Sequence, residues 1–354
     1  MWRPLPWLIK MASGWKRHWK RYAAIAAISV ILVGGLVLQA DPRDLADKLA
    51  SVDPFLLGAA VALSLLSILL RAVRWHVLLL AADQKLRFRT SLVQLLVGQA
   101  LNDLTPVKVL GDAVRIVGVN KEACVPIGSG LASIVEEKLM DVMLVTAVMI
   151  VSAVLLFPIM PFQAWMVITA VVGLVVLANI VILLVLRHPD IISKAGSVAT
   201  RAARRLRRGE GADRLEGALD KTARSFGQAL VNSQGANRRL TMAAAGLTVP
   251  IWALEFGRLF MVMAALGSIA SLPAVVVAST LSITAQVFLP AGSGSVAVVS
   301  DVFAATGVAL TTAAAAGILS VATSIWLTVP LALLALLVTG TRIDTEEAQR
   351  LEVL

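Results

Sequence analysis

The chain has 354 residues, of which 58% are hydrophobic and only 15% are charged, and its mean hydropathy is +0.85. A soluble domain is nearer half apolar and a quarter charged, so this composition argues against an ordinary soluble protein and predicts an all-α polytopic membrane protein. The formal net charge of +10 lies largely between apolar runs, which favours anionic lipid over nucleic acid as a partner.

The first segments predict a helix that crosses the membrane from a cytoplasmic N-terminus. Residues 1–21 combine six bases and four tryptophans with no acid, which is typical of an interfacial stretch. The apolar run 22–40 follows and is expected to stay as an uncleaved first span. Residues 41–53 carry four acids and two bases, so we expect them on the outer side.

The next apolar run, 55–70, is expected to return to the cytoplasm and ends in Arg71 and Arg74. These arginines are three residues apart and share one helix face. Two interpretations stay open. Both side chains snorkel to the cytoplasmic boundary, or both bind a lipid headgroup.

The segment from Asn102 to Arg115 is the most informative part of the chain. It follows the apolar run 91–101, which as a helix reaches only about half of a membrane thickness. We expect the run to dip into the membrane and to return, because polar, helix-breaking backbone at that depth needs a protein or water-filled surrounding. The alternative is a cytoplasmic loop with an amphipathic helix. The candidate binding residues here are Asn102, Pro106, Gly111, Asp112 and Arg115.

A group of charges precedes the long apolar run 142–157: Glu137, Lys138 and Asp141. Glu137 and Asp141 lie on one helix face, where like charges cost energy unless a cation lies between them. Lys138, Arg115 or a substrate group would supply that cation. The alternative is that these charges lie in solvent at the start of the helix, where acids interact favourably with the helix dipole.

After a span at 165–186, the segment 187–239 is the one long polar region, with twelve bases and five acids. Apolar residues recur in it at roughly helical spacing. We expect two cytoplasmic amphipathic helices, broken near Gly209 and Gly211, that lie against anionic lipid or the helix bundle. The organisation is therefore a first transmembrane half at 22–186, this cytoplasmic segment, a second half at 240–340 and a cytoplasmic tail at 341–354.

The second half carries an acid and a base in the middle of a span, Glu255 and Arg258. Charges at this depth are expected to face the bundle interior, either as a functional pair or as a self-neutralising structural pair. The apolar run 273–289 then ends in a proline and glycine break. We include Pro290, Gly292 and Gly294 among the candidate binding residues.

The two halves show a similar order: long helix, apolar half-span, Pro/Gly break, return leg, long helix. The positive-inside rule makes the first half-span start in the cytoplasm and the second start outside. The sequence thus predicts about six full transmembrane helices plus two re-entrant or broken helix pairs in an inverted-topology repeat. Paired interrupted segments of this kind indicate a transporter's site near the membrane midplane.

The chain shows no pattern for a cofactor or metal. Its one cysteine, Cys124, excludes an intramolecular disulfide and a Cys-based metal cluster, and its three histidines lie far apart in the sequence.

Four motifs in this order resemble the flippase-like transmembrane domain of lysylphosphatidylglycerol synthases. They are Arg71-x-x-Arg74-Trp75, Asn102-x-x-x-Pro106-x-x-x-x-Gly111-Asp112-x-x-Arg115, Glu137-Lys138-x-x-Asp141, and Pro290-x-Gly292-x-Gly294. The resemblance covers roughly residues 20–340. It implies a membrane fold that moves or handles lipids such as a phospholipid, a hopanoid or a polyprenyl-linked lipid, in the inner membrane of a bacterium.

Two departures from the family pattern limit what the resemblance implies. Members often carry a glutamate just after the glycines, where this chain has Ala297. The aminoacyl-transferase domain of the full synthases has no counterpart in these 354 residues. The resemblance therefore does not support aminoacyl transfer by this chain.

We expect a lipid transporter in which Arg74, Arg115 and Arg258 hold a phosphate and the acids Asp112, Glu137, Asp141 and Glu255 balance them or relay protons. One rival is a non-transporting membrane partner that recruits a lipid-modifying or envelope-biosynthesis enzyme through residues 187–239. The other rival is a membrane-embedded lipid transferase with Asp112 or Glu137 as its base. The oligomeric state is not encoded in any pattern that we recognise.

Overall fold

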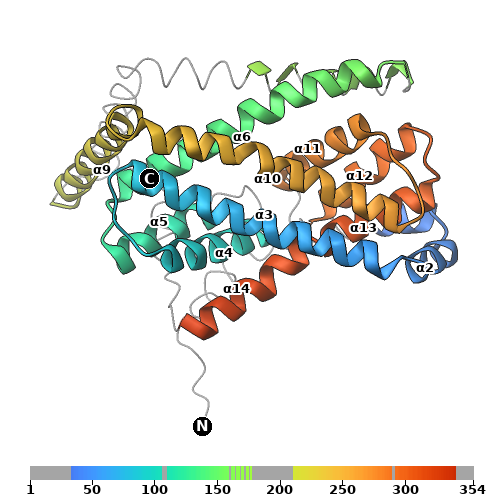
Figure 1. Ribbon diagram of the computed structural model, residues 1–354, viewed down its shortest axis with the longest axis horizontal. Coiled ribbons are helices and arrows are strands. Elements are labelled where there is room, and N and C mark those ends of the chain that lie inside the picture. Colours follow the sequence, from blue (N-terminus) through green and yellow to red (C-terminus); the bar gives the residue numbers. More distant parts are fainter. Residues whose placement is uncertain are drawn as a thin grey trace, which may run out of the picture.

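The computed structural model describes residues 33–105, 110–158, 210–288 and 292–339, together with 161–163, 165–167, 169–170, 173–174 and 176–177. All elements in these ranges are helices, as the sequence predicts (Figure 1). Three of them, and the stretch Leu310–Thr339, are long and apolar enough to cross a membrane. The two further spans expected at 22–40 and 165–186 fall largely outside the described residues.

The first unit runs from α3 to α6. Helix α3 (Pro54–Ala81) begins where the Asp53 carboxylate accepts hydrogen bonds from the backbone of Phe55 and Leu56, with Pro54 in the first turn. Helix α4 (Phe88–Leu104) and helix α5 (Leu110–Ala123) form the expected short pair, and α6 (Ile127–Leu156) is the long helix that follows.

The second unit repeats this order with α10 (Arg238–Ala265), α11 (Leu272–Phe288) and α12 (Ser293–Ala305). Its last span is two helices, α13 (Leu310–Ala322) and α14 (Ile325–Thr339), rather than the one expected. The division at Thr323 has a polar cause. Arg258 donates to the Ser320 carbonyl at 2.9 Å, and Ser64 donates to the Thr323 carbonyl at 2.5 Å.

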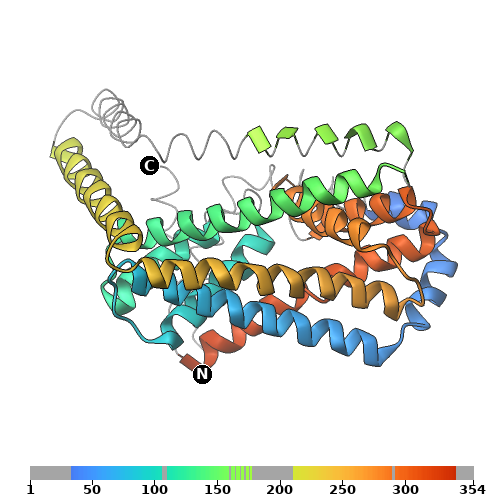
Figure 2. The same cartoon turned by 45° about the horizontal axis from the view of Figure 1, so that its top comes forward.

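The packing of the two units is reciprocal. The leading helices α3 and α10 run along each other, α6 packs against α11 of the second unit, and α14 packs against α4 of the first. Figures 1 and 2 show the α4–α5 pair in the half of the molecule next to α9, and the α11–α12 pair in the half next to α2. The two short pairs thus enter the bundle from opposite ends, which is the arrangement of an inverted repeat.

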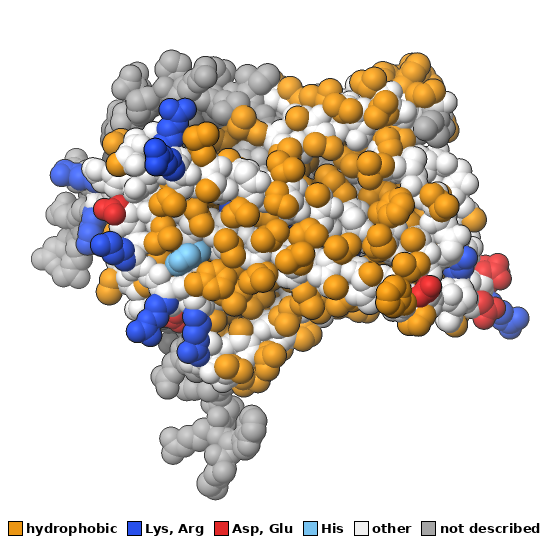
Figure 3. Space-filling model, viewed as in Figure 1, with side chains coloured by type: hydrophobic (Ala, Val, Ile, Leu, Met, Phe, Trp, Pro, Cys, Tyr) orange, Lys and Arg blue, Asp and Glu red, His pale blue; other side chains and the backbone are white. Residues whose placement is uncertain are grey.

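Two helices lie at the ends of this bundle. Helix α2 (Pro42–Ala50) carries three acids if its capping residue Asp41 is included, and helix α9 (Glu210–Gln234) packs on α6 at the other end. Figure 3 shows hydrophobic side chains over the middle of one face, and Lys and Arg side chains gathered at the α9 end. This distribution suits a protein embedded in a membrane with a basic and an acidic side.

Candidate functional site

Arg74 lies at the centre of a buried ion-pair network. Its guanidinium donates to both oxygens of Asp141, from Nη1 at 2.6 Å and from Nη2 at 2.8 Å, and to the Thr248 hydroxyl at 3.2 Å. Glu137 lies 3.5 Å from Arg74 Nη2. Arg74 is therefore the cation between Glu137 and Asp141, a place for which the sequence suggested Lys138, Arg115 or a substrate.

The burial of these acids excludes one of the two interpretations of their position. Helix α6 begins at Ile127, well before Glu137, and the residues Glu137 and Asp141 are only 4% and 9% exposed. They therefore do not form a solvated helix start. A buried charge without a partner costs several kcal/mol, which explains why each carboxylate meets a guanidinium.

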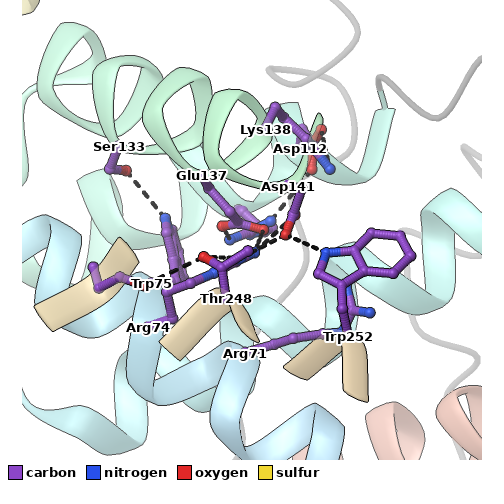
Figure 4. A network of polar contacts seen from close by, with 12 residues as sticks. Arg71, Arg74, Trp75, Asp112, Ser133, Glu137, Lys138, Asp141, Thr248 and Trp252 are labelled. Atoms are coloured by element: carbon purple, nitrogen blue, oxygen red, sulfur yellow. Dashed lines mark hydrogen bonds and ion pairs between the residues drawn. The ribbon is translucent and has the colours of Figure 1, made fainter. Parts of the chain in front are cut away.

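Arg115 is the second buried guanidinium and comes from the return helix α5. Its Nη2 donates to Glu137 Oε2 at 2.7 Å, and its guanidinium carbon lies 4.2 Å from the ring centre of Trp75. Trp75 in turn donates from Nε1 to the Ser133 hydroxyl at 3.1 Å, which fixes the ring (Figure 4). A desolvated cation over an indole gains about 2 kcal/mol, so Trp75 contributes to holding Arg115.

The close approach of α4 and α5 requires glycine at two positions. A Cβ on Gly111 would lie 1.9 Å from the Gly98 carbonyl oxygen, and a Cβ on Gly98 would lie 2.3 Å from Arg115 Cγ. Helix α5 begins at Leu110, so Gly111 lies in its first turn. Its backbone N–H donates to Asn102 Oδ1 at 2.8 Å, which ties the end of α4 to the start of α5.

Asp112 and Lys138 form a looser pair at the edge of the network. Lys138 Nζ lies 3.6 Å from Asp112 Oδ2, and the Lys138 side chain is 51% exposed. The other oxygen, Asp112 Oδ1, accepts from Asn102 Nδ2 at 3.1 Å and lies 3.4 Å from Arg115 Nη1. Asn102 and Arg115 thus orient this carboxylate, while Lys138 contacts it less closely.

The second unit joins the network through Trp252 on α10. Its Nε1 donates to Asp141 Oδ1 at 2.9 Å, and Arg71 lies 5.8 Å from its ring centre (Figure 4). Arg71 Nη2 is 3.9 Å from Glu255, which pairs with Arg258 at 2.5 Å. Arg258 is 5% exposed and faces the bundle, as the sequence predicts. Arg71 is partly buried, so it does not simply extend to the boundary.

Part of this network lines a partly open cavity of about 280 Å³. Its walls come from both units, because α3, α4, α5 and α6 supply the charged side and α10 and α11 close it. The polar lining residues are Arg71, Gln99, Asn102, Asp103, Asp112, Arg115, Glu137, Lys138, Asp141, Thr280 and Thr284. Arg74 does not line the cavity and is 0% exposed, so it acts behind the wall.

Four other candidates have a different place. Pro106 and Pro290 lie outside the described residues. Gly292 adopts a left-handed conformation with φ 84° and caps the start of α12, which confirms the expected break of the second pair. A Cβ on Gly294 would lie 2.9 Å from the Ala285 carbonyl oxygen, so this glycine lets α11 and α12 approach. Neither glycine lines the cavity.

The sequence did not lead us to several residues of the cavity. Trp252, Thr280 and Thr284 belong to none of the four sequence motifs. Only the packing of α10 and α11 brings them to the first unit. Asp103 lies next to the candidate Asn102, and it accepts a hydrogen bond from Thr328 on α14 at 2.9 Å. In the described part of the chain, no group of three His, Cys, Asp or Glu side chains is placed to hold a metal ion.

Comparison with known proteins places the chain in a family. The UPF0104 membrane protein of Methanothermobacter thermautotrophicus is similar to it, with 24% identity over 317 residues that cover 86% of this chain and 91% of that protein. The family model described as the lysylphosphatidylglycerol synthase TM region matches residues 23–332, which include the whole charged network and both units of the repeat except the end of α14. The chain therefore belongs to the lysylphosphatidylglycerol synthase TM region family.

Proposed function

We propose that this protein is a lipid transporter that binds a lipid headgroup in the cavity between its two units and carries it across the membrane. The acyl or polyprenyl tails would stay in the bilayer. The observation that carries this proposal is a cavity lined by seven ionisable side chains inside a bundle of apolar helices. Charges within a membrane cost about 2.5–3.5 kcal/mol each on the insertion scale and usually mark a substrate or ion pathway.

The inverted arrangement supports movement rather than static binding. The α4–α5 pair comes from one end of the bundle and supplies Asp112 and Arg115, whereas α11 comes from the opposite end and supplies Thr280 and Thr284. Rocking of one repeat unit against the other around such a shared site exposes it to each side in turn. A phospholipid, a hopanoid or a polyprenyl-linked lipid would be the cargo.

The buried network has a structural task as well, although Arg115, Glu137 and Asp141 also line the cavity. Arg74, Asp141, Glu137 and Arg115 hold α3, α5 and α6 together and fix the charges of the wall. Lys138, Asp112 and Arg71 are more exposed or more loosely paired, so they are the side chains with which a headgroup exchanges contacts. The protein acts by transport and not by catalysis, without a cofactor.

The charge distribution supports an orientation in a cell inner membrane. The basic end with α9 would face the cytoplasm and the acidic end with α2 would face outward, by the positive-inside rule. Both chain termini would then lie on the cytoplasmic side.

The outer face of α9 favours a second candidate function. Lys221 and Arg224 on this helix, and Arg238 and Arg239 after it, are exposed. This basic face would recruit a lipid-biosynthesis enzyme if the protein is a scaffold that does not transport. A scaffold loses its role when α9 is displaced, whereas a transporter keeps its activity after reconstitution.

The test is lipid movement in proteoliposomes that contain only this protein. Phospholipids labelled on an acyl chain and a labelled polyprenyl phosphate are offered to the wild type, to Arg115→Ala and to Arg89→Ala. Arg89 is an exposed arginine outside the cavity and serves as the control. Movement by the wild type and the control, but not by Arg115→Ala in folded form, supports the proposal. Equal movement by all three, or by none, contradicts it.

A further inference from the structure

The pair of Lys138 and Asp112 is longer and more exposed than the pairs Arg74–Asp141 and Arg115–Glu137 of the same network. Arg74 and Arg115 are 0% and 4% exposed and contact their carboxylates at 2.6 Å and 2.7 Å. Lys138 is half exposed and stays 3.6 Å from Asp112. A charge-assisted hydrogen bond to a carboxylate is normally about 2.7–2.9 Å long. Little interaction free energy is therefore lost when a ligand separates Lys138 from Asp112.

Asp112 is nevertheless held in a fixed orientation. Asn102 and Arg115 contact its Oδ1, and the backbone N–H of Gly111 holds Asn102 in turn. Its Oδ2 stays on the side of Lys138 and the cavity. A carboxylate prepared in this way suits a cationic hydrogen-bond donor of a ligand, because little ordering entropy is lost on binding.

The formal charges of the cavity sum to zero when Arg74 is included. Asp103, Asp112, Glu137 and Asp141 balance Arg71, Arg115, Lys138 and Arg74, which bonds two of these acids from behind the wall. A monoanionic headgroup would leave one uncompensated negative charge in this buried region, which is costly. A headgroup with one negative and one positive charge would leave the balance unchanged.

On the basis of the proposed function, we propose that the cargo is a zwitterionic aminophospholipid, whose headgroup replaces the contact between Lys138 and Asp112. Its phosphate binds the Lys138 ammonium, and its own ammonium binds Asp112 Oδ2. Two buried donors of the cavity wall, Arg115 Nε and Thr280 Oγ1, have no hydrogen-bond partner among the described residues.

The experiment measures the ratio of the transport rates of two lipids in the same proteoliposomes. A loss of folded protein lowers both rates and leaves this ratio unchanged. Two acyl-labelled lipids, one with an ethanolamine headgroup and one with a glycerol headgroup, are followed in the same proteoliposomes. The wild type should move the ethanolamine lipid faster. Asp112→Asn removes the ammonium contact and gives the cavity a positive charge, so the ratio of the two rates should fall about tenfold or more, as for a lost hydrogen bond to a charged group.

Two further variants complete the test. Lys138→Gln removes the phosphate contact and should slow both lipids, whereas Asp301→Asn makes the acid-to-amide change on α12, outside the cavity lining, and should leave the ratio unchanged. Movement of both lipids with a ratio that Asp112→Asn does not alter would overturn the assignment of the zwitterion and leave the transport function standing. Absence of any movement by the wild type would overturn both.

Discussion

Arg74 and Asp141 join α3 to α6 through two parallel hydrogen bonds, at 2.6 Å and 2.8 Å, inside the bundle. The removal of one member of a buried pair leaves an uncompensated charge and typically costs 3–5 kcal/mol. We therefore expect Arg74→Met to lower the thermal stability of the purified protein strongly.

The control for this variant is the double change Arg74→Met with Asp141→Leu. It removes both charges and should recover part of the lost stability, because Glu137 keeps Arg115 as its partner. Thermal unfolding in detergent, followed by size-exclusion chromatography, compares the three proteins. A double variant that is less stable than Arg74→Met alone would show that the pair is not coupled in this way.

The contact of α4 with α5 gives a prediction about a single methyl group. Gly111→Ala places a Cβ against the Gly98 carbonyl oxygen and Asn102, so the helices must separate. Overpacking of this kind costs about 1–3 kcal/mol or more, and it displaces Asn102 from Asp112. We expect lower stability and slower lipid movement in the proteoliposome assay.

Gly58→Ala is the matched control for that change. Gly58 lies within α3, and its Cβ would have no neighbour within 4 Å. Alanine in a helix interior is favoured over glycine by roughly 0.5–1 kcal/mol, so this variant should be as stable as the wild type or slightly more so. If both alanine variants are equally stable, the close approach of α4 and α5 is not what requires glycine at position 111.

Thr328 connects α14 to the cavity residue Asp103 through a hydrogen bond of 2.9 Å. Thr328→Val keeps the shape of the side chain and removes the donor. We expect a loss of about 1–2 kcal/mol, in the range measured for polar contacts between membrane helices. Thr328→Ser retains the hydroxyl and should stay close to the wild type in the same thermal unfolding measurement. An unchanged valine variant would contradict a role for this contact.

The docking of α9 on α6 depends on Gly128, where a Cβ would lie 2.2 Å from the Thr222 carbonyl oxygen. The same contact surface includes Ser233, which donates to the buried carboxylate of Glu136. Gly128→Leu should therefore release α9 from α6. Trypsin, which needs a locally unfolded backbone, should then cut faster after the already exposed Lys221 and Arg224. The control is Gly227→Leu, since a Cβ at Gly227 would have open space.

The two candidate functions predict different activities for that variant. A transporter with released α9 continues to move lipid in proteoliposomes, because the cavity residues come from other helices. A scaffold would show no such movement in any form. Continued protection of α9 from trypsin in Gly128→Leu would mean that this glycine does not control its docking.

The sequence allowed us to predict the repeat because its signals are local. Apolar runs of half-span length, the break before Gly292 and the charge bias of the loops are each visible within about thirty residues. The α13–α14 division was missed for the opposite reason. It depends on Arg258 and Ser64, which lie far from Thr323 in the chain and contact it only after the helices pack.

Neighbouring residues show why the details of the site could not be predicted. Glu136 and Glu137 are adjacent acids, yet Glu136 meets Ser233 of α9 while Glu137 meets Arg115 and Arg74. Helical periodicity places them on different faces, but only tertiary packing decides what each face meets. The same holds for Arg74, which sequence reasoning assigned to a phosphate and which lies behind the cavity wall. Its binding role stays a prediction.

The measurement that tests the central claim most directly is the effect of filling the cavity on lipid movement. In a Cys124→Ser background, a single cysteine replaces Thr284, which lines the cavity, or Gln228, which is exposed on α9. Each protein is reacted with a bulky maleimide, and the extent of labelling and the rate of lipid movement are both recorded. If the cavity is the passage, movement stops in the Thr284→Cys protein and continues in the Gln228→Cys protein. Unchanged movement in a fully labelled Thr284→Cys protein would contradict the claim.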